Sequence, residues 1–351
     1  ICLDYSSINI AKRFHIGHLS TTMLGHSLAR IYRFLGYKTV SINHLGDWGT
    51  QFGKLIYAYK TWGSREEVEA KGVPELTRLY VKFHEEAEQH PELEDEGRRW
   101  FKAIEDGNAE ALELFNWFKE LTLRDAKPVY DLLGVQFDSY NGESFYVDKT
   151  DRVVKELREK NLLTISDGAS VVDLDEEKSG MPPCLILKKD GTTIYATRDI
   201  AAALYRKETY DFDKCLYVVA YQQDLHFRQW FKVIEKMGYP WYKDLVHVAF
   251  GMISYEGQSL STRKGHVLFL EDVLNMAIEK ARAIIEEKSP NLENKDEVAR
   301  QVGVGAVVYA DLQNSRIKDI DFSWERVLSF DGETGPYVQY THARCCSALR
   351  K

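Results

Sequence analysis

Two histidines, His15 and His18, stand three positions apart in the segment "RFHIGHLSTT". On the first turn of a helix this spacing places both imidazoles on one face, and Gly17 between them offers only backbone. Such a turn suits a nucleotide, because a flat base or ribose can approach a glycine closely while imidazoles and helix N-terminal amides face phosphate oxygens. Taken alone, an ordinary pair of surface histidines explains the motif equally well.

A second segment, "SLSTRKGHVLFL" from Ser259 to Leu270, is a loop of small and cationic residues that leads into an apolar stretch. Arg263 and Lys264 could reach a phosphate from this loop. By itself a short basic loop is usually a solvated turn. Combined with the histidine turn in one fold, it predicts a clamp for phosphate groups.

The elements that must position these motifs alternate between strand and helix. "ICLDY" has the pattern of a strand, and a helix follows it, with apolar residues at helical spacing from Leu24 to Leu35 and Gly36 as its C-terminal cap. "YKTVSIN", "KCLYVVA" and "LVHVAFGMI" are further expected strands. This order predicts an α/β fold with a doubly wound parallel sheet, whose ligands bind at the carboxyl ends of the strands. Asp4 and the histidine turn both fall at that end.

Composition narrows the class of protein. The chain has 351 residues, 44% of them hydrophobic, and a net charge of -8, so contact with nucleic acid would have to use local basic patches. No apolar run approaches the ~20 residues that span a bilayer, and we expect no membrane contact and a cytoplasmic location. Five cysteines without C-x-x-C spacing predict neither zinc nor a disulfide framework. We expect a monomer.

Five blocks in order carry a family resemblance: "SSINIAKRFHIGHLSTT", "HLGDWGTQFGKLI", "YATRDIAAALYR", "VVAYQQDLHFRQ" and "LSTRKG". Together they resemble the catalytic domain of an arginyl-tRNA synthetase, a class I aminoacyl-tRNA synthetase. The first and last blocks are similar to the two class I signatures, HIGH and KMSKS. The "GDWGTQFG" and "YATRD" segments are characteristic of the arginine enzyme.

The resemblance implies a reaction in two steps. L-arginine and ATP form arginyl-adenylate and pyrophosphate, and the arginyl group then passes to the terminal ribose of tRNA(Arg). The carboxylate of arginine attacks the α-phosphorus in line, so negative charge builds up on phosphate oxygens in the transition state. Mg²⁺ is expected to accompany ATP without a dedicated protein cage.

The resemblance also implies roles for individual residues. His15, Gly17, His18 and Lys264 match the ATP site, and Arg263 is a second candidate for steadying the pyrophosphate. For the arginine substrate, Asp4 and Asp199 could supply carboxylates, and Tyr195 lies one helical turn before Asp199. The full set expected at the arginine site is Asp4, Ser7, Asn9, His18, Tyr195, Asp199 and Gln223.

The expected domain organisation follows the same comparison. Residues 1–270 form a Rossmann-like catalytic domain, interrupted by insertions at about 60–115 and 145–192. Around residues 164–195, "ASVVDL" and "PCLILKKDGTTIYAT" are expected strands, with "KKDG" as a turn between two of them, and residues 271–288 and 296–315 are expected helices. Residues 271–330 form a helical connecting segment, and residues 331–351 begin a truncated helical anticodon-binding domain. Because the chain starts in a strand without a methionine, we expect a fragment of a longer protein. The resemblance implies that activation of arginine depends on bound tRNA, so we expect the fragment to bind ATP or arginine but to activate arginine poorly.

Three positions depart from the family pattern: Ile8 replaces a proline, Ser20 an arginine and Ser259 the first lysine of the second signature. Two other functions remain open. A nucleotidyltransferase of the same H-x-G-H architecture would also handle ATP, although such chains are generally shorter and lack "YATRD". A catalytically silent paralogue would bind tRNA without forming adenylate.

Overall fold

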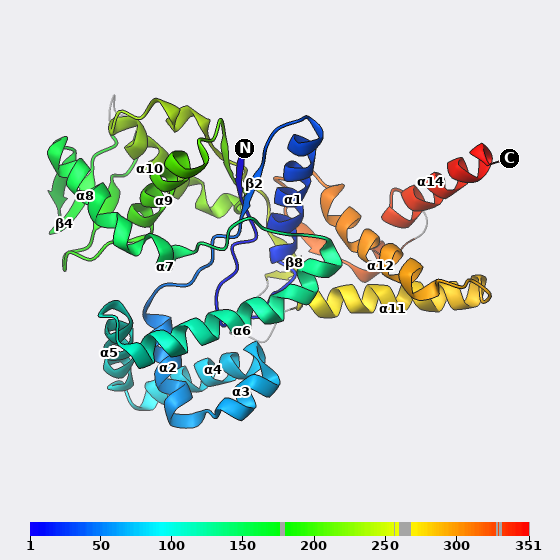
Figure 1. The fold of residues 1–351 in the computed structure, drawn as a ribbon, viewed down its shortest axis with the longest axis horizontal. Coiled ribbons are helices and arrows are strands. Elements are labelled where there is room, and N and C mark those ends of the chain that lie inside the picture. The colour runs from blue at the N-terminus through cyan, green and yellow to red at the C-terminus, as the bar shows by residue number, and fades with distance from the viewer. Residues whose placement is uncertain (176–179, 256, 260–267, 328, 330–331, 351) are drawn as a thin grey trace. The chain divides into compact units, whose positions relative to one another are not determined.

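The computed structural model describes residues 1–175, 180–255, 257–259, 268–327, 329 and 332–350 (Figure 1). The chain divides into two compact units. The first unit contains Ile1–Ser7, Leu24–Gly46 and Phe137–Phe250, and the second contains Ile8–Met23, Asp47–Gln136 and Gly251–Lys351.

The first unit is built on a four-stranded parallel sheet. Its strands lie in the order β2 (Val40–Ile42), β1 (Cys2–Asp4), β6 (Cys215–Tyr217) and β7 (Leu245–His247). β1 and β6 are buried along their whole length, as expected for strands covered on both faces. The chain passes from β1 to β2 on one side and from β6 to β7 on the other. The direction of winding therefore reverses between β1 and β6, which confirms the predicted doubly wound α/β fold.

Three helices belong to this sheet. α1 (His18–Phe34) joins β1 to β2, α9 (Tyr195–Tyr210) precedes β6, and α10 (Asp224–Lys236) joins β6 to β7 (Figure 1). Gly36, with φ 88°, follows the end of α1 as predicted. A Cβ on Gly25 would lie 2.1 Å from Cγ of Tyr5, so α1 packs directly on this ring just after β1.

An antiparallel sheet of three strands also lies in the first unit: β3 (Leu163–Ser166), β4 (Ala169–Val172) and β5 (Cys184–Leu187). α7 (Glu143–Tyr146), the 3-10 helix Val147–Lys149 and α8 (Thr150–Glu159) precede it. The expected turn at "KKDG" is present, because Gly191 N donates to Lys188 O. The strand expected after this turn was wrong: it is reduced to one bridge between Thr193 and Leu187, and α9 begins directly afterwards.

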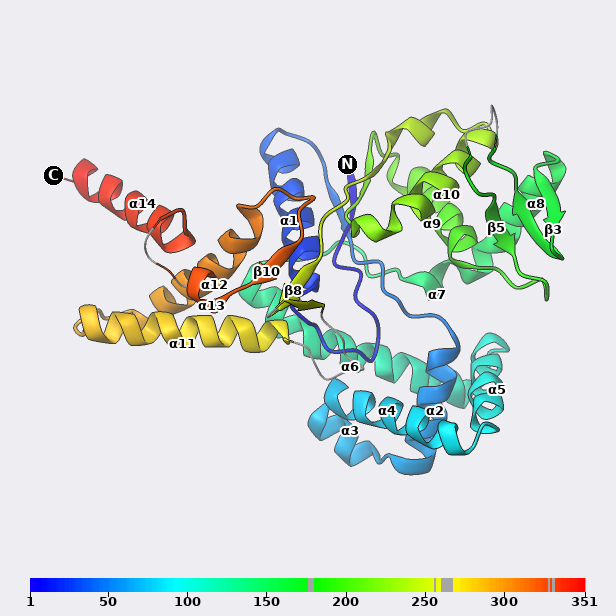
Figure 2. The same cartoon turned by 180° about the vertical axis from the view of Figure 1, so that it is seen from behind.

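The second unit contains a group of helices: α2 (Thr50–Trp62), α3 (Arg65–Lys71), α4 (Val73–Gln89), α5 (Leu93–Glu105) and α6 (Ala109–Leu133). Figure 2 shows α3, α4 and α2 beside the long helix α6. Side chains cap two of these helices, since Ser64 accepts from Glu67 N before α3 and Asn108 accepts from Ala111 N before α6. These caps fix where α3 and α6 begin.

The rest of the second unit combines a small sheet with further helices. Its strands lie in the order β10 (Ile320–Phe322), β8 (Ile253–Tyr255) and β9 (Gln258–Ser259). The helices are α11 (Leu270–Lys288), α12 (Lys295–Leu312), α13 (Trp324–Val327) and α14 (Gly335–Leu349). α11 and α12 match the predicted helices, and they touch closely, because a Cβ on Gly303 would lie 2.6 Å from Ile278 N.

Within the described ranges, no helix is long and apolar enough to cross a membrane, and no three His, Cys, Asp or Glu side chains gather in a way that could hold a metal ion.

Candidate functional site

The two histidines of the H-x-G-H turn lie together in the second unit. Their ring centroids are 4.0 Å apart, and α1 begins at His18. Gly17 N donates to Nδ1 of His15 at 3.1 Å, so in the neutral ring of His15 the proton sits on Nε2. Nδ1 of His18 lies 3.2 Å from both the N and the O atom of His15, and either tautomer fits there. His15 therefore offers one N–H donor to a ligand.

Burial keeps both rings uncharged. It lowers the pKa of His15 to about 4, with a smaller contribution from the nearby Lys12 ammonium. Burial also lowers the pKa of His18 to about 3, and the charge that His15 would carry if protonated adds to the effect. At neutral pH the pair acts through hydrogen bonds and not as a positive charge.

The turn is held by the residues that follow the basic loop. Ile16 N donates to Leu268 O at 2.8 Å, and Leu270 N donates to Phe14 O at 2.9 Å. The two segments therefore pair around His15 and Phe269 as a short antiparallel bridge. The predicted phosphate ligands Arg263 and Lys264 lie outside the described residues.

A cavity of about 110 Å³ opens beside the histidines and brings predicted residues together. Its lining includes Asn9, Lys12, Arg13, His15 and His18. Asn9 was expected at the arginine site, His15 at the ATP site and His18 at both, and in the second unit all three line one cavity.

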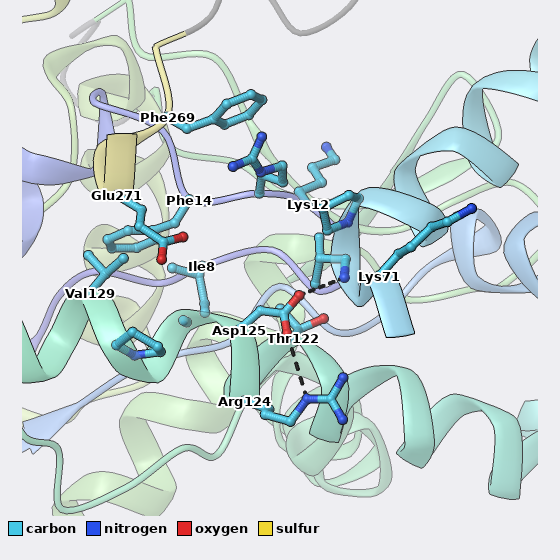
Figure 3. A pocket seen from close by; sticks show the side chains of 15 residues that line it. Ile8, Lys12, Phe14, Lys71, Thr122, Arg124, Asp125, Val129, Phe269 and Glu271 are labelled. Carbon is cyan, nitrogen blue, oxygen red and sulfur yellow. Dashed lines mark hydrogen bonds and ion pairs between the residues drawn. The ribbon is translucent and has the colours of Figure 1, made fainter. Parts of the chain in front are cut away.

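A larger cavity of about 310 Å³ also borders the loop before the histidines (Figure 3). Two of its cations have partners within the chain: Arg13 stacks on the ring of Phe269 at 3.4 Å, and Arg124 pairs with Asp125 and Glu69. Asp125 in turn accepts from the backbone of Val73, as the dashed lines in Figure 3 mark. The contacts of Arg13, Arg124 and Asp125 thus serve the fold.

Ser20, which replaces the arginine of the family pattern, has a specific partner. Its Oγ donates to Oδ1 of Asp311 on α12 at 2.6 Å. Burial raises the pKa of the Asp311 carboxyl to about 6, and the bond from Ser20 partly offsets this shift. The departure at position 20 is therefore matched by a long-range contact that connects the first turn of α1 to α12.

Backbone strain concentrates in the loop after β1. Ser6 (φ 71°), Ser7 (φ 47°) and Ala11 (φ 59°) adopt left-handed conformations that residues with a side chain rarely take. In the second unit, Ala11 N donates to Thr122 Oγ1 at 2.9 Å. Such strain persists where the surroundings fix it, and it is common at functional sites.

In the first unit, Asp4 is buried at the carboxyl end of β1, with 5% of its surface exposed. Its Oδ1 accepts from Ser7 Oγ at 2.9 Å, and its Oδ2 pairs with Nη1 of Arg206 at 2.8 Å. Burial disfavours the charge of Arg206, yet the Asp4 carboxylate holds the pKa of this guanidinium well above its ordinary value. Since a carboxylate accepts about four hydrogen bonds, Asp4 can still take further partners.

Tyr195 and Asp199 both lie near the start of α9, four residues apart on one helix face. Asp199 pairs with His226 on α10, with Oδ2 and Nε2 2.6 Å apart. Gln223 ends the 3-10 helix Tyr221–Gln223, is exposed, and directly precedes α10. These residues follow β6 or lie on the helix before it.

The expected site residues thus form two groups. Asp4, Ser7, Tyr195, Asp199 and Gln223 belong to the first unit, whereas Asn9, His15, Gly17 and His18 belong to the second. Sequence reasoning missed Arg206 and His226, the partners of the two aspartates. Both stand inside the quoted blocks "YATRDIAAALYR" and "VVAYQQDLHFRQ", which was the signal available for them.

Comparison with known proteins identifies the family. The family model described as "tRNA synthetases class I (R), catalytic domain" matches residues 1–324. The chain belongs to this family. The arginine--tRNA ligase of Clostridioides difficile is 64% identical to this synthetase chain over all 351 residues, and that of Alkaliphilus metalliredigens is 60% identical. In each case the matched part is 62% of the relative's own length.

Solved structures agree with this assignment to the class I synthetases. The arginyl-tRNA synthetase of Thermus thermophilus superposes on the whole chain with a TM-score of 0.85 at 26% identity, and the chain covers 64% of it. The arginyl-tRNA synthetase of Plasmodium falciparum gives 0.81 at 29% identity, with 58% of that chain covered. The predicted resemblance to the arginine enzyme is confirmed.

Proposed function

We propose that the protein is an arginine-tRNA ligase, which activates L-arginine with ATP and transfers the arginyl group to tRNA(Arg). The observation that carries the proposal is the match of the whole chain to relatives named arginine--tRNA ligase, at 64% and 60% identity. The two neutral histidines supply hydrogen bonds for the phosphates of ATP. Asp4 and Asp199 supply carboxylates for the arginine substrate.

In the activation step, the arginine carboxylate attacks the α-phosphorus of ATP in line and pyrophosphate leaves. His15 donates its Nε2–H to phosphate oxygens, and His18 adds a second neutral ring beside it. Gly17 allows the nucleotide to approach the backbone. Because both histidines are uncharged, the positive charge that steadies pyrophosphate comes from Lys264, with Arg263 as the alternative.

Recognition of arginine requires a planar cation to meet a carboxylate, and a fork-shaped guanidinium pairs best with two oxygens at once. Asp199 supplies this carboxylate, and Asp4, which pairs with Arg206, supplies a second one. By the family resemblance, Ser7, Asn9, His18, Tyr195 and Gln223 are further candidates for binding the same substrate.

Further parts of the proposal concern the surroundings of the reaction. Mg²⁺ arrives with ATP, held by the phosphates, and neutralises their charge. The protein acts in the cytoplasm, as a monomer. In this proposal the catalytic domain ends at residue 270, and the helical connecting segment ends at residue 330.

The decisive experiment is ATP–pyrophosphate exchange by the complete protein, with and without tRNA. We expect exchange that depends on arginine and is not stimulated by lysine. Stimulation by a phosphorylated small molecule instead of arginine would favour the nucleotidyltransferase, and tRNA binding without exchange would favour the silent paralogue. Alanine variants of Lys264 and Arg263 then identify the pyrophosphate contact, since an unaffected Lys264→Ala would assign it to Arg263.

A further inference from the structure

The pairing of His226 with Asp199 has a geometry suited to positioning. Nε2 of His226 lies 2.6 Å from Oδ2 of Asp199, which is shorter than the roughly 2.7–3.2 Å that is usual for a hydrogen bond between nitrogen and oxygen. Both side chains keep about a quarter of their surface exposed, 28% and 27%. The pair is therefore open to a ligand and not sealed in the core.

The helices that carry the two residues are fixed by one hydrophobic core. Ile200 follows Asp199 directly and is fully buried, and Phe227 follows His226 directly and is 7% exposed. Both residues belong to the same core cluster of the first unit. With both backbones anchored, the remaining freedom of Asp199 is rotation of its own side chain, and the bond from His226 restricts this rotation.

The bond uses only part of the carboxylate. His226 contacts Oδ2, so Oδ1 and the outer lone pair of Oδ2 can accept from another group. A guanidinium fork needs both oxygens in one plane, whereas an ammonium is a point charge that tolerates rotation of the carboxylate. A fixed carboxylate plane thus favours arginine over lysine.

We propose that His226 is a positioning residue that holds the Asp199 carboxylate in the orientation that binds the guanidinium of the substrate. This inference rests on the proposed function. His226 acts through Asp199 and does not itself touch the reacting atoms.

The test compares His226→Ala, which removes the N–H donor, with His226→Gln, whose side-chain amide retains one. In arginine-dependent exchange by the complete protein, the alanine variant should raise the KM for arginine about tenfold. Its kcat and its KM for ATP should stay within about twofold of the wild type. The glutamine variant should recover most of the arginine KM, and a calorimetric titration of arginine alone should give the same order of affinities.

His90→Ala is the matched control. It removes another imidazole-carboxylate pair, in which Nδ1 of His90 lies 3.2 Å from Oε1 of Glu92 on an exposed stretch of the second unit. We expect no change in any kinetic constant.

Three results would overturn the positioning role. The first is an unchanged KM for arginine in His226→Ala, and the second is an equal defect in the alanine and glutamine variants. The third is a decrease in kcat together with an increase in the KM for both arginine and ATP. A wild-type protein that exchanges with arginine while His226→Ala behaves normally contradicts this inference alone. A wild-type protein that neither exchanges with arginine nor binds it contradicts the proposed function as well.

Discussion

Replacing Asp311 with asparagine should stabilise the protein at neutral pH but not at acid pH. The pKa of the folded carboxyl is raised to about 6 from an ordinary 3.8, because burial disfavours its charge. Each pKa unit corresponds to about 1.4 kcal/mol, so two units amount to roughly 3 kcal/mol. The pKa of Asp311 is higher in the folded protein than in the unfolded chain. Below pH 3.8 the carboxyl is neutral in both states and the fold keeps its full stability. This part of the free energy of unfolding is lost as the pH rises through 6 and the buried carboxyl ionises. Asparagine carries no charge and avoids the loss.

The measurement is urea denaturation of wild type and Asp311→Asn at pH 4.5 and pH 7.5. We expect the variant to gain up to about 3 kcal/mol relative to wild type at pH 7.5, and much less at pH 4.5. Ser20 can still donate to the amide oxygen of the variant, so the contact survives. Asp296→Asn is the control: this residue lies on the same helix with 77% of its side chain exposed, and its effect should be below about 1 kcal/mol at either pH.

A difference between Asp311→Asn and wild type that does not change with pH would refute the reasoning. So would a variant less stable than wild type at pH 7.5. Ser20→Ala gives an independent check, because it removes the donor that lowers the pKa of Asp311. It should destabilise the protein by about 1–3 kcal/mol at pH 7.5 and by less at pH 4.5.

Three further predictions concern other contacts. Asp4→Asn should cost about 3–5 kcal/mol in denaturant unfolding, because it leaves the buried guanidinium of Arg206 without a carboxylate, and a loss below 1 kcal/mol would contradict the ion pair. Gly25→Ala should lower stability by about 1–3 kcal/mol, since its Cβ would clash with Tyr5; an unchanged melting temperature would speak against this close packing. The ring of His18 should show no NMR titration between pH 5 and 8, because burial lowers its pKa to about 3. The stability linked to the neutral ring is present above pH 6.5 and falls as the pH drops towards 3. Titration of this ring near pH 6.5 would disprove its burial.

Local patterns predicted much of the fold. Apolar residues at helical spacing predicted α1, and the alternation of strands with helices predicted the parallel sheet. The helices expected at residues 271–288 and 296–315 correspond to α11 and α12. The strand expected after "KKDG" failed because Thr192, Thr193 and Ile194 favour an extended backbone, while the helical pattern of α9 begins only one residue later. Boundaries between competing local preferences are decided by packing, which one sequence does not display.

The sequence predicted which residues belong to the candidate site, but not which side chains they contact. Asp4 and Asp199 were expected as carboxylates, yet nothing in their own segments indicates that Arg206 and His226 bind them. Ser20 was visible only as a departure from a pattern, and its partner lies 291 positions further along the chain. Contacts of this kind depend on the tertiary fold, so they require the coordinates.

The left-handed backbone at Ser6, Ser7 and Ala11 also predicts which sequences a selection experiment would recover. Glycine and asparagine adopt this conformation at little cost, whereas β-branched residues do so very rarely. A library randomised at these three positions and selected for folded protein should become enriched in glycine and asparagine and depleted of valine and isoleucine. The backbone conformation of this loop would then restrict which residues the three positions accept, in addition to the hydrogen bond that the side chain of Ser7 donates to Asp4.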